Sequence, residues 1–131
     1  MSYTSIHFPG SADYLRAVRR FTRTVVGDVP GVRDVVQVAN ELAANAILHT
    51  ASGEEGGTFV LHLATFTNRW QVRVDDMGGM GVPRMCTASE EDEAGRGLTL
   101  VAALSESWGV LGDCYARAVW AEISKPEEVM A

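Results

Sequence analysis

Residues 40–49 read Asn40-Glu41-Leu42-Ala43-Ala44-Asn45-Ala46-Ile47-Leu48-His49, an apolar run interrupted by polar residues at four-residue intervals. At helical pitch this spacing puts Glu41, Asn45 and His49 on one face of a helix. The opposite face can pack inward through Val38, Leu42 and Ala46. A carboxylate one turn before a carboxamide can hold a proton acceptor and a metal-bound phosphate on one rigid element. A solvated helix face has the same spacing, so the pair alone does not identify a site.

The composition is that of one ordinary domain. The chain has 131 residues, of which 47% are hydrophobic, so we expect a single domain over residues 1–131 with a substantial core. The formal net charge of -6 argues against the broad basic surface with which proteins bind nucleic acid. The N-terminus shows no leader pattern, and no stretch is long and apolar enough to cross a bilayer. We therefore expect a cytoplasmic protein that binds neither nucleic acid nor membrane.

Cysteine and lysine are sparse. Cys86 and Cys114 lie far apart without a Cys-x-x-Cys pattern, which predicts free thiols rather than a zinc site or a disulfide framework. Lys125 is the only lysine and follows the last apolar run. Any nucleotide site in this chain therefore lacks a phosphate-binding Gly-Lys-Ser/Thr loop.

The first part of the chain predicts a strand followed by a helix. Residues 3–8 alternate between polar and apolar positions, and Ser11 or Asp13 can cap a helix that runs to about Val26. One face of this helix carries arginines at helical spacing: Arg16, Arg19, Arg20 and Arg23. This arginine ridge is equally well explained as a docking surface for an acidic partner or as a solvated face.

An antiparallel hairpin is predicted after the helix that carries the opening motif. That helix runs to about Thr50, and a glycine-rich turn at 52–57 ends it. Residues 58–65 and 70–76 then alternate with a period of two. The inward face of the second strand carries three apolar residues and then a carboxylate: Trp70, Val72, Val74 and Asp76. A buried carboxylate is costly unless it finds donors, so Asp76 is expected to have a polar partner or a ligand.

The longest stretch without helix or strand periodicity follows this hairpin. It spans residues 81–94 and contains an acidic run at 90–93. Long irregular loops inside compact domains often act as lids, and we expect a lid at about 82–95.

The chain ends with a short helix and two strands. The stretch Gly95-Arg96-Gly97-Leu98 leads into an apolar helix that runs to about Leu104, and its glycine-flanked start offers backbone amides to an anion. Strands are expected at 107–111 and 115–123. Two tryptophans in these strands are expected in the core: Trp108 and Trp120.

Three short motifs follow one another on a helix, a strand end and a helix start. They are Glu41-x-x-x-Asn45, Asp76-x-Gly78 and Gly95-x-Gly97. Together they resemble the N box and the two glycine boxes of the GHKL superfamily, which includes DNA gyrase, histidine kinases and mismatch-repair ATPases. Further stretches resemble the single-domain anti-sigma-factor serine kinases of actinobacteria: Phe8-Pro9-Gly10, Asn40-Glu41-Leu42-x-x-Asn45-Ala46-x-x-His49, Gly95-Arg96-Gly97-Leu98 and Val119-Trp120-Ala121-Glu122. The likeness covers about residues 8–123.

The resemblance implies an α+β Bergerat fold, a two-layer α/β sandwich in which helices cover one face of a mixed, mostly antiparallel sheet. It also implies ATP and Mg²⁺ as cofactors. Glu41 would be the general base, and Asn45 would coordinate the Mg²⁺. Asp76 would accept the adenine amino group, and Gly78 would let the adenine approach. The backbone amides of one short stretch would cradle the phosphates, with the Arg96 side chain adding positive charge: Gly95, Arg96, Gly97 and Leu98.

The resemblance also gives meaning to the remaining stretches. The loop at 82–95 would be the ATP lid, and His49 is expected to be structural rather than catalytic. The arginine ridge would face a sigma factor or an anti-anti-sigma factor, the latter being the serine-bearing substrate. A homodimer is compatible with the resemblance.

One stretch departs from the family pattern. Before the last strand the family usually has Gly-Lys-Thr, whose threonine helps to hold the adenine. This chain has Ala116-Arg117-Ala118 instead. A hydroxyl contact with the adenine is therefore missing unless Thr99 or another group replaces it.

Two functions follow, and a third is disfavoured. The first is a regulatory serine protein kinase and anti-sigma factor that phosphorylates an anti-anti-sigma factor. The second is a catalytically weak or inactive binding protein of the same fold that sequesters its partner. The presence of both Glu41 and Asn45 favours the kinase, because sequestration needs no base. The catalytic part of a histidine kinase is disfavoured, because no histidine-bearing dimerisation helices precede the domain.

Overall fold

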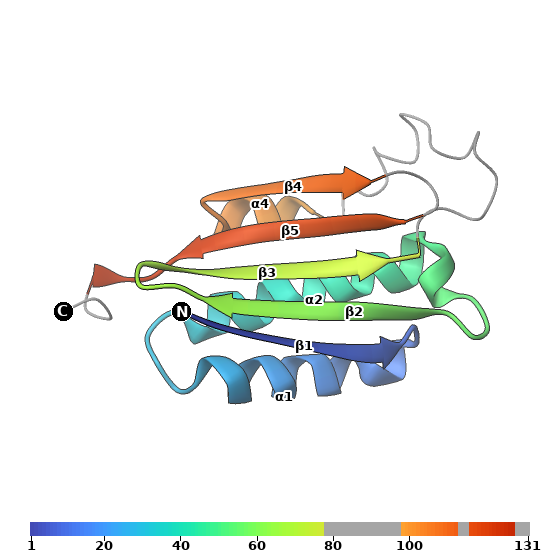
Figure 1. The fold of residues 1–131 in the computed structure, drawn as a ribbon, viewed down its shortest axis with the longest axis horizontal. Helices are drawn as coiled ribbons and strands as arrows, with labels where there is room; N and C mark the ends of the chain where they lie inside the picture. The colour runs from blue at the N-terminus through green and yellow to red at the C-terminus, as the bar shows by residue number, and fades with distance from the viewer. Residues whose placement is uncertain (78–97, 113–115, 128–131) are drawn as a thin grey trace.

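The computed structural model describes residues 1–77, 98–112 and 116–127 of the chain (Figure 1). The predicted lid at 82–95 and the predicted free thiols Cys86 and Cys114 lie outside these residues.

Within the described residues, five strands form one sheet in the order β1-β2-β3-β5-β4. All four neighbouring pairs are antiparallel. The strands are β1 (Ser2–Pro9), β2 (Thr58–Thr65), β3 (Arg69–Asp76), β4 (Ser107–Gly112) and β5 (Arg117–Ser124). The helices are α1 (Leu15–Val26), α2 (Val32–His49) and α4 (Thr99–Leu104), with 3₁₀ turns η1 (Ala12–Tyr14) and η2 (Ala51–Gly53). The predicted α+β fold class is confirmed.

The helices cover one face of the sheet. Figure 1 looks onto the other face, here called the open face, with α1, α2 and α4 behind it. Helix α2 packs on β3 and β5 and has α1 and α4 as neighbours. This arrangement puts α2 behind the middle of the sheet, so its inward side chains form the centre of the core.

Alternation along the strands determines which side chains enter this core. In β3 every second residue is buried, and the residues between them are half-buried on the open face. The same alternation holds in β2 from Thr58 to Leu63. The buried residues of the two strands face the helices, and they are mostly apolar: Phe59, Leu61, Leu63, Trp70, Val72 and Val74. The predicted hairpin and its inward face are therefore confirmed.

Helix α2 packs as its sequence predicts. The inward residues Val38, Leu42 and Ala46 are each 0% exposed. Gly31 precedes the helix with φ +94, and a Cβ there would lie 3.0 Å from the Trp70 ring, so both the backbone conformation and the space favour glycine. Near the other end, Thr50 leaves the helical conformation, and its hydroxyl accepts from the Ser52 amide at 3.0 Å. The helix therefore ends where the turn residues begin.

The prediction that Trp108 and Trp120 are core residues is wrong. Trp108 lies on the edge strand β4 and is 37% exposed, because no further described strand pairs with the outer edge of β4. Trp120 is half-buried on the open face, and a Cβ at its neighbour Gly109 would lie 2.9 Å from the indole. Its ring therefore packs over a glycine of β4 rather than between the sheet and the helices. None of the described helices combines the length and the apolar character of a membrane span.

Candidate functional site

Asn45 and Glu41 of α2 differ in whether their side chains have hydrogen-bond partners. Asn45 is 3% exposed, and neither its Nδ2 nor its Oδ1 has a hydrogen-bond partner among the described residues. Glu41, one turn earlier, is half-buried and accepts a hydrogen bond from Gln37 Nε2 at 3.0 Å. His49 is also half-buried. Buried side-chain amides normally have partners, so the unsatisfied Asn45 is a candidate for contact with a ligand.

Asp76 ends β3 on the face that α2 covers. Its side chain is 0% exposed, as the inward alternation of the strand predicts. Directly opposite on β5 lies Arg117, whose Nε is 3.5 Å from Asp76 Oδ1. The two side chains form an ion pair in which the Arg117 side chain is only 11% exposed. A carboxylate with this burial needs the neighbouring positive charge.

The register of β3 and β5 places Arg117 and Ala118 on opposite faces of the sheet. Ala118 pairs with Asp75, so both residues lie on the open face, whereas Arg117 shares the face of Asp76. The side chain of Ala118 therefore lies on the opposite face of the sheet from that of Asp76. Thr99, considered as a replacement hydroxyl, is the first residue of α4 and is exposed.

Sequence reasoning missed Arg117. Counting back in steps of two from the buried residues Ile123, Ala121 and Val119 places it on the inward face. The signal was therefore present in the strand itself, and comparison with the family motif concealed it.

The remaining predicted site residues are mostly outside the described part of the chain, namely Gly78, Gly95, Arg96 and Gly97. Leu98 is described, lies at the start of α4 and is 2% exposed. The Leu98 carbonyl accepts a hydrogen bond from the Ala102 amide at 2.9 Å, so it takes part in the backbone hydrogen bonding of α4. The phosphate-binding role of this stretch stays a prediction.

The described residues suit a magnesium ion that is held mainly by a nucleotide. No group of three or more His, Cys, Asp and Glu side chains within the described ranges is able to hold a metal ion. Mg²⁺ commonly takes one or two protein ligands and completes its shell with water and substrate phosphates. The amide oxygen of Asn45 suits such a single contact.

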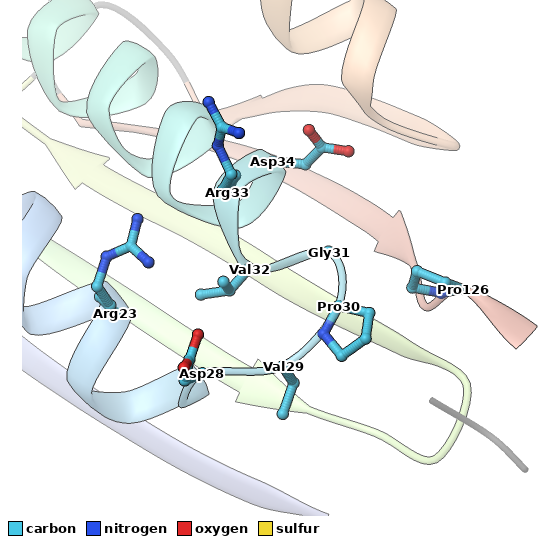
Figure 2. Close-up of a pocket in the computed structure, with 9 residues that line it drawn as sticks. All are labelled: Arg23, Asp28, Val29, Pro30, Gly31, Val32, Arg33, Asp34 and Pro126. Carbon is cyan, nitrogen blue, oxygen red and sulfur yellow. The ribbon is translucent and has the colours of Figure 1, made fainter. Parts of the chain in front are cut away.

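A cavity of about 690 Å³ lies at the start of α2, at the other end of this helix from Asn45 (Figure 2). Its charged side chains are of both signs: Arg23, Asp28, Arg33 and Asp34. None of the predicted site residues lines it. This cavity is therefore separate from the candidate site.

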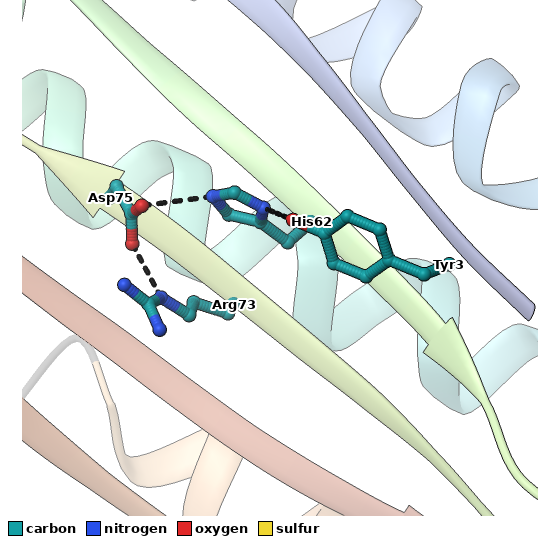
Figure 3. A network of polar contacts seen from close by, with 4 residues as sticks. All are labelled: Tyr3, His62, Arg73 and Asp75. Atoms are coloured by element: carbon teal, nitrogen blue, oxygen red, sulfur yellow. Dashed lines mark hydrogen bonds and ion pairs between the residues drawn. The ribbon is translucent and has the colours of Figure 1, made fainter.

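The open face carries a polar network of its own (Figure 3). His62 Nε2 contacts Asp75 Oδ2 at 2.9 Å, and Arg73 Nε donates to Asp75 Oδ1 at 2.6 Å. The other ring nitrogen of His62 forms a hydrogen bond with the Tyr3 hydroxyl. Both oxygens of Asp75 are thus satisfied by the protein, and the network supports the sheet without requiring a ligand.

Comparisons with known proteins agree with this fold. Residues 8–113 match the family model of the histidine kinase-like ATPase domain. The chain is similar to the solved structure of the RsbU and RsbW domains of Rv1364c from Mycobacterium tuberculosis, with a TM-score of 0.66 and 18% sequence identity. The match covers 94% of this chain and 33% of that one, so this chain spans about a third of the solved protein. At this identity the likeness shows the fold alone. No curated protein matches the sequence. Because the family model matches most of its length, the chain belongs to the histidine kinase-like ATPase domain family.

Proposed function

We propose that this protein binds ATP with Mg²⁺ and transfers the γ-phosphate to a serine of a protein partner. The observation that carries the proposal is Asn45, a fully buried amide without a hydrogen-bond partner among the described residues, one helical turn after a half-buried carboxylate. Family membership supports ATP as the nucleotide. The bound ion would neutralise charge on the phosphates.

Each side chain of the site would have one task. Asn45 would contact the nucleotide-bound ion through its amide oxygen. Glu41 would take the proton of the serine hydroxyl as that oxygen bonds to the γ-phosphorus and the bond to ADP breaks. Asp76 would accept a hydrogen bond from the adenine amino group. A rigid helix holds the first two groups, which favours a fixed geometry for transfer.

The protein partner would meet the arginine ridge on α1. All four arginines are exposed, and two of them, Arg16 and Arg20, line a groove of about 490 Å³ between α1 and β1. The apolar side of the groove includes Phe8 and Phe21. This mixture suits an acidic segment with apolar side chains. Such a partner would be a sigma factor, or an anti-anti-sigma factor that carries the acceptor serine.

The ridge is also connected to the helix of the site. Arg19 Nη1 donates to Asn40 Oδ1 at 2.8 Å, and Asn40 precedes Glu41 in α2. A partner bound to α1 would therefore lie close to the helix that holds the proposed base.

Incubation with labelled ATP, Mg²⁺ and candidate anti-anti-sigma factors tests the proposal. Label should appear on a serine of one partner with the wild type. Asn45→Ala should lose both metal-dependent nucleotide binding and transfer, because Asn45 would hold the ion that organises the phosphates. Arg33→Ala, an exposed change near the other end of α2, is the control and should behave as wild type. Absence of nucleotide binding by the folded wild type would refute the proposal.

The second candidate function is sequestration of a sigma factor without phosphate transfer. The exposed ridge and its groove favour it, since they require no chemistry at Glu41. The two functions separate in one experiment. A protein that binds ATP and its partner but labels no serine, and that Glu41→Ala leaves unchanged, would be a sequestering protein.

A further inference from the structure

Arg117 has unused hydrogen-bonding capacity inside the candidate site. It lies directly across from Asp76 on the face that α2 covers, and its side chain is 11% exposed. The distance of 3.5 Å from its Nε to Asp76 Oδ1 is that of an ion pair and is too long for a good hydrogen bond. Within the described ranges, its Nε and Nη2 have no hydrogen-bond partner. Buried guanidinium donors without acceptors are costly, which indicates an acceptor from a ligand.

A second arginine on the same two strands shows what a satisfied pair looks like. Arg69 Nε donates to Glu122 Oε2 at 3.1 Å on the open face, and its Nη1 donates to Asn68 Oδ1 at 3.2 Å. The side chains of Arg69 and Glu122 are 34% and 24% exposed, so water can complete their hydrogen bonds. Arg117 is more buried and less satisfied than Arg69.

We propose that Arg117 is a base-recognition residue of the nucleotide site. Its guanidinium donates to a ring nitrogen of adenine while Asp76 accepts from the adjacent amino group. This inference rests on the proposed function, because it takes adenine as the base bound at Asp76.

The chemistry of adenine matches this pair of side chains. The amino group of adenine donates hydrogen bonds. The ring nitrogens N1 and N7 lie on either side of it and only accept hydrogen bonds. A carboxylate beside a guanidinium presents an acceptor next to a donor, which is the complement of one such edge. Arginine's planar set of donors suits recognition in a fixed geometry. The ion pair would also hold the carboxylate in place for the amino group.

Titration calorimetry with ATP and two analogues tests the proposal. In the analogues a CH group replaces either N1 or N7. The wild type should bind one of them about ten- to a hundredfold more weakly than ATP, the usual effect of losing a charge-assisted hydrogen bond. Arg117→Met, which keeps an apolar side chain of similar length, should bind ATP and that analogue equally. The matched control Arg69→Met should discriminate as the wild type does. Thermal melting without nucleotide verifies that each variant is folded.

Several outcomes would overturn the inference. Equal binding of ATP and both analogues by the wild type would show that no ring nitrogen is read. Discrimination by Arg117→Met as strong as in the wild type would assign the contact to another residue. If Arg117→Met does not fold, the double variant Asp76→Asn/Arg117→Met takes its place, because it removes the donor without leaving an unpaired buried charge. Unchanged discrimination by that variant overturns the inference too. A folded wild type that binds no ATP would instead refute the proposed function itself.

Discussion

Asp75 and Asp76 are neighbours in the sequence and lie on opposite faces of the sheet. The side chain of Asp75 is 33% exposed and makes contacts of 2.9 Å with His62 and 2.6 Å with Arg73 on the open face. The side chain of Asp76 is 0% exposed and pairs with Arg117 at 3.5 Å on the face that the helices cover. One step along a strand therefore separates a satisfied surface network from a buried polar site.

The two surroundings differ in what they leave unsatisfied. On the open face, His62 and Arg73 both lie at hydrogen-bonding distance from the oxygens of Asp75. On the covered face, the side-chain amide of Asn45 and two nitrogens of Arg117 have no hydrogen-bond partner within the described residues. Native proteins rarely leave such groups buried and unsatisfied, so this difference supports the proposal that the covered face takes the ligand.

The largest expected difference between the two faces is in phosphate transfer. Glu41→Ala should reduce the transfer rate by about a hundred- to ten-thousandfold, the usual contribution of a general base, while ATP binding stays nearly intact. His62→Ala removes a polar side chain from the open face and should leave the rate unchanged. Single-turnover transfer from labelled ATP to the cognate partner measures both. A comparable loss in the two variants would show that the covered face has no special role in the chemistry.

Stability should separate the two aspartates as well. Asp76→Ala leaves the Arg117 guanidinium buried without its counter-ion, which should lower the free energy of unfolding by about 3–5 kcal/mol. Asp75→Ala removes contacts that water can reach, so it should lower the free energy of unfolding by about 1 kcal/mol or less. Urea denaturation followed by circular dichroism gives both values. Equal losses would mean that the ion pair of Asp76 is as accessible to water as the network on the open face.

Much of the fold could be predicted from local sequence patterns. Alternation along β2 and β3 and the helical spacing in α2 predict these elements and their inward faces, because both patterns reflect contact with one core. The burial of Asp76 follows from the same alternation. The order of the strands and the register between β3 and β5 depend on contacts between distant residues, and short patterns do not contain them.

The errors of prediction have the same origin. Trp108 is exposed because β4 is an edge strand, which its own sequence does not reveal. Arg117 could be recognised as a candidate site residue only when its register partner was known to be Asp76. The unsatisfied state of Asn45 likewise depends on surroundings that helical spacing cannot specify, whereas its place one turn after Glu41 could be predicted.

Salt should affect the two faces differently, although this effect is the smallest of the series. The cost of Asp75→Ala should shrink towards zero in 1 M NaCl, because dissolved ions screen charges that water reaches. The cost of Asp76→Ala should change little, since its side chain is buried. Repeating the urea titrations at low and high salt measures both. The reverse dependence would contradict the burial of the ion pair in solution.

In the proposed function the covered face binds the nucleotide and the open face does not. The most direct test of this claim is calorimetric titration of Mg²⁺ and ATP into the wild type, Asp76→Asn and Asp75→Asn, three proteins of nearly identical side-chain volume. Asp76→Asn exchanges a charge-assisted hydrogen bond for a neutral one and should weaken binding by about tenfold, whereas Asp75→Asn should bind as the wild type does. Equal affinity in all three proteins, or a loss confined to Asp75→Asn, would contradict the claim.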